Sequence, residues 1–291
     1  PESNHIHKRM LQISRKVHEA AKKLKVKSGK LKVNPKSKLS TLNSFTSGRL
    51  GRLAEESEPV RGGQLSTLFH ELWKGQCNDA YWHGIFGGLY LPHLRSSLYR
   101  HLLNAESMAE KQLGEDVSVE EGDIDCDGFR DICISRGDLT AFFTEDSGAL
   151  IELSSKGKQV NVLDILTRRP EAYHSRISET SQNDSGETKT IHDPGRLGAK
   201  ESGITDYLIY DNYRRASLLD HFFDYNIRLD ELMRSEYDEK GDFIGSPYLL
   251  ERINERQALG VRLSREGLAS GNNVKIDKSV SFRKSGIRVD Y

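Results

Sequence analysis

Residues 92–113, PHLRSSLYRHLLNAESMAEKQL, and the Gly114 that follows them mark the point at which the predicted structure of the chain changes. Pro92 suits the first turn of a helix. Apolar side chains then recur in steps of three and four residues, at Leu94, Leu98, Leu102, Ala105, Ala109 and Leu113. This spacing places them on one face of a helix that ends near Gly114.

The same spacing occurs in the stretch His5–Leu24, at Ile6, Met10, Ile13, Val17, Ala20 and Leu24. After Gly114 the pattern changes to short runs rich in β-branched and aromatic residues, at Ile132–Ser135, Leu139–Thr144, Leu150–Ser154, Val160–Leu163 and Tyr207–Tyr210, and near Phe243, Val261, Val274 and Val280. A short helix is expected around Ser217–Phe223. Helices first and strands afterwards favour an α+β fold.

This pattern predicts four parts: a leading helix at 1–24, a flexible basic insert at 25–66, a small helical domain at 67–115, and an antiparallel β-sandwich at 118–291. The insert is assigned to the stretch that lacks periodicity and is dominated by Lys, Ser, Gly and Asn. The chain begins with Pro1 and stops at Tyr291, shortly after an alternating run. We therefore expect an internal piece of a longer protein, with a sandwich incomplete at its C-terminal end.

Composition narrows the class of protein. The net charge is zero, but residues 1–61 carry 15 Lys/Arg against 5 Asp/Glu. A nucleic-acid-binding arm at 5–52 is one alternative, although this arm has a single Phe and no series of stacking aromatics. No run approaches the roughly 18 apolar residues that a membrane span needs. The three cysteines form no CxxC pair, which favours a reducing, cytoplasmic location.

The most unusual motif is Gln76–Gly84, QCNDAYWHG, which combines an amide, a carboxylate, an imidazole and two large aromatic rings. Aromatic faces stack on the C–H side of a sugar, and polar side chains bind its hydroxyls. If the motif is helical, Asn78, Tyr81 and Trp82 share one face, and Asp79, Trp82 and His83 share another. The alternative is a buried aromatic cluster with satisfied polar partners.

With its continuation IFGGLYLPHLR to Arg95, the motif resembles the central helical domain of glycoside hydrolase family 57, the 4-α-glucanotransferase/α-amylase group. Shorter similarities lie at 1–4 and 7–10, in the segment that follows the catalytic barrel of that family, and at 148–153, 168–169, 173–174 and 214–221, in its C-terminal β-sandwich. The resemblance implies a retaining enzyme acting on α-1,4-glucans or maltooligosaccharides. It implies no nucleic-acid or membrane partner, and it leaves a homodimer open.

The resemblance also implies where the chemistry lies. The nucleophile and the acid/base carboxylate of the family belong to an N-terminal (β/α)7 barrel, so no catalytic residue is assigned here and the chain is expected to be inactive alone. Asp79 and Trp82 are implied to border the glucan cleft, with Asn78, Tyr81 and His83 as neighbours. The rival interpretation is a non-catalytic carbohydrate-binding or scaffold protein derived from the same family.

A second motif, DIDCDGFRD at 123–131, has carboxylates at its positions 1, 3, 5 and 9 and glycine at position 6. Oxygen ligands in this order suit Ca²⁺, and the ligands would be Asp123, Asp125, Asp127 and Asp131. Ile134 stands where an EF-hand has a glutamate. No cofactor is expected for the chemistry, and a calcium ion here would be structural. An acidic turn held by backbone hydrogen bonds is the alternative.

Overall fold

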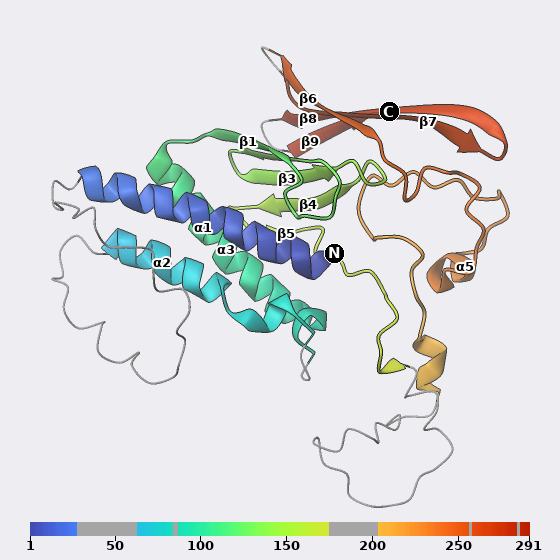
Figure 1. The fold of residues 1–291 in the computed structure, drawn as a ribbon, viewed down its shortest axis with the longest axis horizontal. Helices are drawn as coiled ribbons and strands as arrows, with labels where there is room; N and C mark the ends of the chain where they lie inside the picture. The colour runs from blue at the N-terminus through green and yellow to red at the C-terminus, as the bar shows by residue number, and fades with distance from the viewer. Residues whose placement is uncertain (28–62, 84–86, 175–202, 256–257, 284–285) are drawn as a thin grey trace, which may run out of the picture. The chain divides into compact units, whose positions relative to one another are not determined.

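The computed structural model describes residues 1–27, 63–83, 87–174, 203–255, 258–283 and 286–291 (Figure 1). Its helices are α1 (Glu2–Lys27), α2 (Gly63–Gly75), α3 (Pro92–Leu113) and α5 (Leu229–Arg234), with 3-10 turns η1 (Asn78–Tyr81), η2 (Gly88–Tyr90) and η3 (Ile204–Tyr207). Its strands are β1 (Val117–Gly122), β2 (Asp131–Arg136), β3 (Leu139–Thr144), β4 (Leu150–Ser155), β5 (Val160–Asn161), β6 (Leu249–Glu255), β7 (Ala258–Ala269), β8 (Asn272–Arg283) and β9 (Gly286–Asp290). The α+β class is therefore confirmed.

The described chain divides into two compact units. The first, called the helical unit here, comprises Pro1–Phe143, Glu152–Asp164 and Phe282–Gly286. The second, called the β unit, comprises Thr144–Ile151, Ile165–Ser281 and Ile287–Tyr291.

In the helical unit, α1 and α2 both pack along α3 (Figure 1). The apolar stripe predicted for the leading helix is buried at Ile6, Ile13, Val17 and Ala20. Helix α3 begins with Pro92 and ends at Leu113, and the Gly114 that follows has a φ of 72°, in the left-handed region. The Gly114 and Glu115 amides both donate to the Glu110 carbonyl, at 2.8 and 3.1 Å, which closes the helix end.

Both helices that flank the predicted basic insert are longer than the sequence pattern indicated. Helix α1 continues through 25–27, and α2 begins at Gly63 rather than Thr67. The central part of the insert, 28–62, lies outside the described residues.

Two antiparallel sheets follow, one in the strand order β1-β2-β3-β4-β5 and one in the order β6-β7-β8-β9. In the first sheet Gly122 pairs with Asp131 and Val117 with Arg136. Strand β2 is buried at every position except Arg136. The face-to-face packing that the term sandwich implies stays a prediction.

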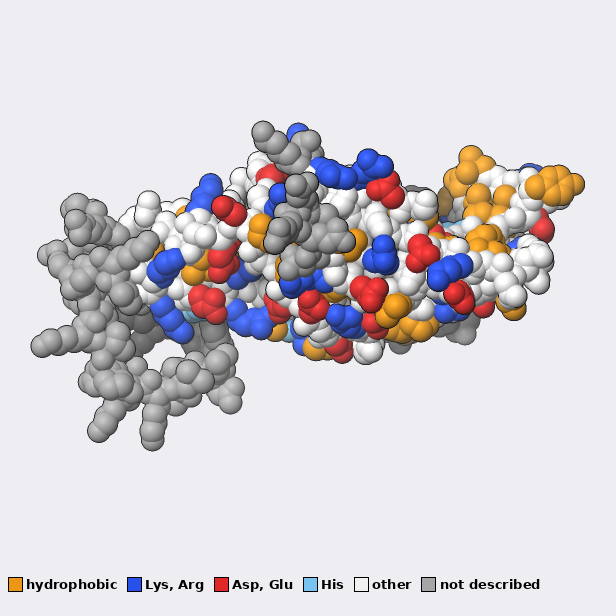
Figure 2. Space-filling view, turned by 90° about the horizontal axis from the view of Figure 1, so that it is seen from above, with side chains coloured by type: hydrophobic (Ala, Val, Ile, Leu, Met, Phe, Trp, Pro, Cys, Tyr) orange, Lys and Arg blue, Asp and Glu red, His pale blue; other side chains and the backbone are white. Residues whose placement is uncertain are grey.

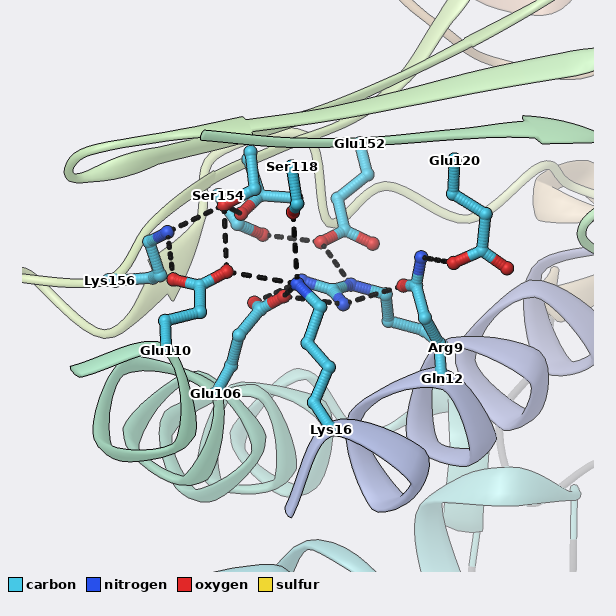
Figure 3. A network of polar contacts seen from close by, with 12 residues as sticks. Arg9, Gln12, Lys16, Glu106, Glu110, Ser118, Glu120, Glu152, Ser154 and Lys156 are labelled. Atoms are coloured by element: carbon cyan, nitrogen blue, oxygen red, sulfur yellow. Dashed lines mark hydrogen bonds and ion pairs between the residues drawn. The ribbon is translucent and has the colours of Figure 1, made fainter. Parts of the chain in front are cut away.

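A network of buried charges joins α1 and α3 to the first sheet (Figure 3). Arg9 of α1 donates from Nε to Glu152 of β4 at 3.1 Å, and its guanidinium forms a second ion pair with Glu106 of α3. These three side chains are entirely buried. Next to them, Lys16 Nζ lies 2.9 Å from a carboxylate oxygen of each of Glu106 and Glu110.

Lys156 completes this buried-charge network by donating to Glu110 at 2.6 Å and to Ser135 at 2.7 Å. These pairs cross from helix to sheet, and most of the first sheet lies in the same compact unit as the helices. The domain boundary predicted near residue 118 stays a prediction. The sequence pattern separates helices from strands, but the buried ion pairs hold them together.

In the β unit, β7 and β8 form a long hairpin in which Ala269 pairs with Asn272. The two turn residues, Ser270 and Gly271, have φ values of 49° and 78°. Positive φ at both positions is typical of a type I′ turn, whose twist matches that of the strands. The apolar core of the hairpin includes Val261, Leu263 and Val280.

The segment around Ser217–Phe223 is not the predicted helix. Ser217 instead forms an isolated bridge with Leu150, with hydrogen bonds of 2.9 and 3.0 Å between their backbones. The backbone groups of Leu218 and Phe222 are used in other ways. Leu218 accepts a hydrogen bond from Lys278, and Phe222 donates one to Glu239. Non-local partners take the place of the local helical ones. Two stretches expected as strands, Tyr207–Tyr210 and the one near Phe243, are not strands either, because Tyr207 ends the turn η3 and Phe243 lies in irregular backbone.

On the face shown in Figure 2, Lys/Arg and Asp/Glu side chains of the described residues lie interspersed rather than in separate patches. Within the described ranges, no helix is both long and apolar enough to cross a membrane.

Candidate functional site

The motif Gln76–Gly84 begins directly after Gly75, the last residue of α2, which packs closely against α3. A Cβ at Gly75 would lie 2.6 Å from Leu102 Cδ2, so glycine permits α2 to approach α3. The chain then makes the single turn η1 and leaves it at Trp82, which is extended with φ −151° and ψ 168°. The helical faces predicted for this motif are therefore wrong, because α-helical spacing does not apply to a 3-10 turn followed by extended backbone.

The motif divides into buried and exposed members. Ala80 is buried and Tyr81 half-buried, with the Tyr81 hydroxyl donating to the Gly75 carbonyl. Burial raises the pKa of the Tyr81 phenol. The members exposed to solvent are Gln76, Cys77, Asn78, Asp79, Trp82 and His83. Trp82 keeps 55% of its surface exposed, so the alternative of a buried aromatic cluster describes Tyr81 and not Trp82.

Two neighbouring segments fix the backbone of this turn. From η2, the Leu89 amide donates to the Trp82 carbonyl at 2.8 Å. Gly88 has φ +43°, and a Cβ there would lie 2.2 Å from the same carbonyl, so only glycine fits. From α1, the Ser3 hydroxyl donates to the Tyr81 carbonyl. The exposed side chains are thus presented by a backbone held from both sides.

This arrangement suits a polyol ligand. An exposed indole offers a face for the apolar side of a sugar ring, and a carboxylate, an amide and an imidazole within five residues of it offer hydrogen bonds to hydroxyls. We call the exposed residues Asn78, Asp79, Trp82 and His83 the Trp82 surface.

The acidic motif forms the hairpin loop between β1 and β2. Asp123, Asp125 and Asp131 each place a carboxylate oxygen within 4.8 Å of the others, and Asp125 and Asp131 are buried. Asp127 is not in this group, and its Oδ1 accepts a hydrogen bond from the Phe129 amide at 3.0 Å. The structure therefore brings together three of the four predicted ligands.

Backbone amides shape the same loop. Asp131 Oδ2 accepts from the Ile124 amide at 2.9 Å, and the Asp123 carboxylate accepts from the Asp127 and Gly128 amides at 3.0 and 3.2 Å. These are the contacts that the acidic-turn alternative predicts. They occupy Oδ2 of Asp131 and both oxygens of Asp123.

Sequence reasoning missed the part that α1 plays at this loop. Asn4 donates to the Asp125 carbonyl, and His5 Nδ1 lies 3.7 Å from Asp125 Oδ2. The other ring nitrogen of His5 lies 2.8 Å from Glu152, which links the loop to the buried-charge network. No local pattern signals these contacts, because Asn4 and Asp125 are 121 positions apart.

Comparison with known proteins gives matches along most of the chain. Residues 49–109 match the family model described as alpha-amylase/4-alpha-glucanotransferase, middle domain. Residues 123–291 match the model described as alpha-amylase/4-alpha-glucanotransferase, C-terminal. The Trp82 surface lies within the middle-domain match, and the acidic loop lies at the start of the C-terminal match.

Among individual proteins, the chain is 38% identical to a 4-alpha-glucanotransferase of Thermococcus kodakarensis over 82% of this chain and 35% of that protein. It is 36% identical to an alpha-amylase of Pyrococcus furiosus over 82% of this chain and 34% of that protein. The crystal structure of the 4-alpha-glucanotransferase from Thermococcus litoralis superposes with a TM-score of 0.66 at 29% identity, covering 99% of this chain and 34% of that one.

The chain therefore spans about a third of the length of the curated relatives that it matches. The family resemblance seen in the sequence is confirmed by two adjoining domain models and by the solved structure. The chain belongs to the alpha-amylase/4-alpha-glucanotransferase family, of which it contains the middle and C-terminal domains.

Proposed function

We propose that this chain forms the C-terminal part of an α-glucan-processing enzyme, a retaining 4-α-glucanotransferase or α-amylase acting on α-1,4-glucans or maltooligosaccharides. The observation that carries the proposal is the exposure of Trp82 beside Asp79 on a turn whose backbone is fixed by Gly88. A rigid, exposed indole flanked by hydrogen-bonding groups is suited to holding a sugar chain.

In this proposal the chain supplies binding and orientation. Trp82 stacks on a glucose ring, and Asp79 accepts a hydrogen bond from a sugar hydroxyl. The nucleophile and the acid/base carboxylate of a retaining mechanism are assigned outside residues 1–291. A sugar acceptor held on the Trp82 surface would take the glycosyl group and give transfer, whereas water in its place would give hydrolysis.

The test uses the full-length protein. We expect Trp82→Ala to lower kcat/KM for long maltooligosaccharides more than for short ones, because it removes a stacking contact worth about 1 kcal/mol beyond area burial. Trp73→Ala is the matched control, since Trp73 on α2 is equally exposed, at 59%, and lies outside the motif. The control should leave the dependence on chain length unchanged.

Asp79→Asn extends the same test, since it keeps the shape of the side chain and removes its charge. It should lower turnover without changing the melting temperature, because Asp79 is exposed. If the Trp82 and Asp79 variants both keep wild-type kinetics at every chain length, the Trp82 surface does not bind substrate. If the wild-type protein binds glucan without turnover, the non-catalytic rival is correct.

We also propose that the acidic loop holds a structural calcium ion between Asp123, Asp125 and Asp131. Two observations support this proposal. One oxygen from each of these carboxylates lies within 4.8 Å of the others, and two of the three carboxylates are buried. Hard oxygen ligands at this spacing suit Ca²⁺. Such an ion would stabilise the β1–β2 hairpin next to the start of α1, where Asn4 and His5 contact Asp125. Thermal unfolding with and without calcium tests this proposal.

A further inference from the structure

The β unit contains a cavity of about 510 Å³ between the segments that precede α5 and those that follow it. Its lining includes Asn212, Tyr213, Tyr237, Asp238, Glu239 and Lys240. A second cavity of about 430 Å³ adjoins it and shares Tyr237 and Asp238. Pockets of roughly 300–1,000 Å³ are the size that small ligands occupy.

One wall of the first cavity is aromatic and preorganised. Tyr213 contacts His221 edge-on at 4.7 Å, and His221 stacks on Phe223 at 5.1 Å with an interplanar angle of 15°. Phe223 in turn contacts Tyr237 edge-on at 5.0 Å. Of these four connected rings, Tyr213 and Tyr237 line the cavity. Rings fixed in this way lose little conformational freedom when a ligand stacks on them.

Polar groups of fixed orientation stand beside these rings. The Glu239 carboxylate accepts from the Phe222 amide at 2.6 Å and lies 2.7 Å from His221 Nδ1. Burial and a hydrogen bond with Tyr213 raise the pKa of the Tyr237 phenol, and the Asn212 amide and the Lys240 ammonium supply further donors. The cavity therefore offers both hydrogen-bond acceptors and donors next to aromatic faces.

The charge of the lining narrows the ligand class. Asp238 and Glu239 outnumber Lys240, whose Nζ lies 3.5 Å from Asp238 and 3.4 Å from Asp224. Carboxylates repel phosphates and other anions, and the density of polar groups is unsuited to a purely apolar ligand. A neutral molecule with many hydroxyls and an apolar face fits both conditions.

We propose that this cavity is a second carbohydrate-binding site, in which Tyr213 and Tyr237 stack on sugar rings and Asn212, Asp238 and Glu239 bind the hydroxyls. That the sugar is an α-glucan rests on the proposed function. The site would hold a polysaccharide chain at the β unit in addition to any contact at the Trp82 surface.

The experiment measures retardation of the full-length protein in native gels that contain soluble starch, in the wild type and in a Trp82→Ala background. Tyr237→Ala should weaken starch retention about two- to twelvefold in both backgrounds, as expected for loss of one aromatic contact of about 0.5–1.5 kcal/mol. Tyr225→Ala is the matched control, because Tyr225 lies in the same unit, is fully exposed and lines neither cavity. It should leave retention unchanged.

Two further variants separate binding from folding. Tyr237→Phe keeps the ring and should retain most of the starch affinity. Asn212→Ala removes an exposed amide outside the ring cluster and should weaken retention at an unchanged melting temperature. Wild-type retention by both Tyr237→Ala and Asn212→Ala would overturn the inference. Failure of the proposed function would instead show as absent turnover of maltooligosaccharides by the wild type. Retention by another neutral polysaccharide but not starch would overturn the assignment to α-glucan.

Discussion

Arg9 in the helical unit and Lys278 in the β unit are both fully buried cations, but their surroundings differ. Arg9 faces two buried carboxylates, Glu106 and Glu152, and belongs to a network that includes Lys16 (Figure 3). Lys278 Nζ has one carboxylate partner, Asp220 at 2.7 Å, and donates otherwise to the carbonyls of Gly148 and Leu218 at 2.9 and 2.7 Å.

The pKa shifts of these groups reflect the difference. For Arg9, burial alone would lower the pKa, but the attraction of Glu106 and Glu152 raises it. For Glu106, burial opposes ionisation, but Arg9 and Lys16 hold its pKa well below the usual range. For Lys278, burial outweighs the attraction of Asp220, and its pKa is lowered. The ionised form of a buried group is thus stabilised where several opposite charges surround it, and less so where only one does.

The largest effect is expected from Arg9→Met. It removes the cation shared by Glu106 and Glu152 and leaves two carboxylates in a buried site. Breaking a buried ion pair in this way should lower the free energy of unfolding by about 3–5 kcal/mol. Urea denaturation of the full-length protein, followed by circular dichroism, measures the loss.

Arg15→Met is the matched control on the same helix. Arg15 pairs with Glu120 at 2.9 Å, but the two side chains keep 67% and 39% of their surfaces exposed. An exposed pair should contribute less than about 1 kcal/mol. Equal losses for the two variants would contradict the view that burial and convergence of charge, rather than the number of ion pairs, hold α1 to the sheet.

A smaller loss is expected from Lys278→Met. The variant leaves the Gly148 and Leu218 carbonyls and the Asp220 carboxylate without their shared donor. Unsatisfied buried acceptors should cost about 1–3 kcal/mol. The long, apolar methionine side chain retains the packing against the Tyr248 ring, over which Lys278 Nζ lies at 4.4 Å. Urea denaturation at pH 7 gives the size of this loss.

The pH dependence of the same variant distinguishes the two units. The folded pKa of Lys278 is lowered, while the unfolded lysine holds its proton up to about pH 10.4. Between these two values the unfolded state binds more protons, so wild-type stability rises with pH relative to the variant. The loss caused by Lys278→Met should therefore grow as pH rises towards about 10. A constant loss would mean that Asp220 alone compensates Lys278 as fully as the network compensates Arg9.

The comparison also explains what the sequence could predict. The apolar stripes of α1 and α3 follow from helical periodicity, and the runs that became β2, β3 and β4 follow from their β-branched and aromatic composition, because both signals are local in the sequence. The burial of Arg9 could not be predicted, since a charged residue beside an apolar stripe is ordinarily solvated. Its partners Glu106 and Glu152 lie 97 and 143 positions away, and no local pattern links them.

The candidate site shows the same division. The residue types of the Trp82 surface were identified from the sequence, because their composition alone is unusual. Their geometry was not, because the turn that carries them is fixed by non-local backbone contacts such as that of the Leu89 amide with the Trp82 carbonyl. The tyrosines of the proposed second sugar site gave no signal, since Tyr213 and Tyr237 are 24 positions apart and are brought together only by the fold.

The smallest predicted effect concerns the acidic loop, where the compensating charge would come from an ion. Calcium at ten times its dissociation constant should stabilise the folded protein by about 1.4 kcal/mol, because it binds the folded loop and not the unfolded chain. The melting temperature should rise by a few degrees, and a chelator should reverse the rise.

Asp125→Asn should abolish the shift, because Asp125 is a buried member of the three-carboxylate group. Asp127→Asn, outside that group, should keep it. The sequence spacing alone predicts that the two variants behave alike. Loss of the calcium-induced rise in melting temperature in both variants would therefore favour the set of four ligands predicted from the sequence. A melting temperature indifferent to millimolar calcium would establish the loop as an acidic turn, held by the backbone amides that already contact Asp123 and Asp131.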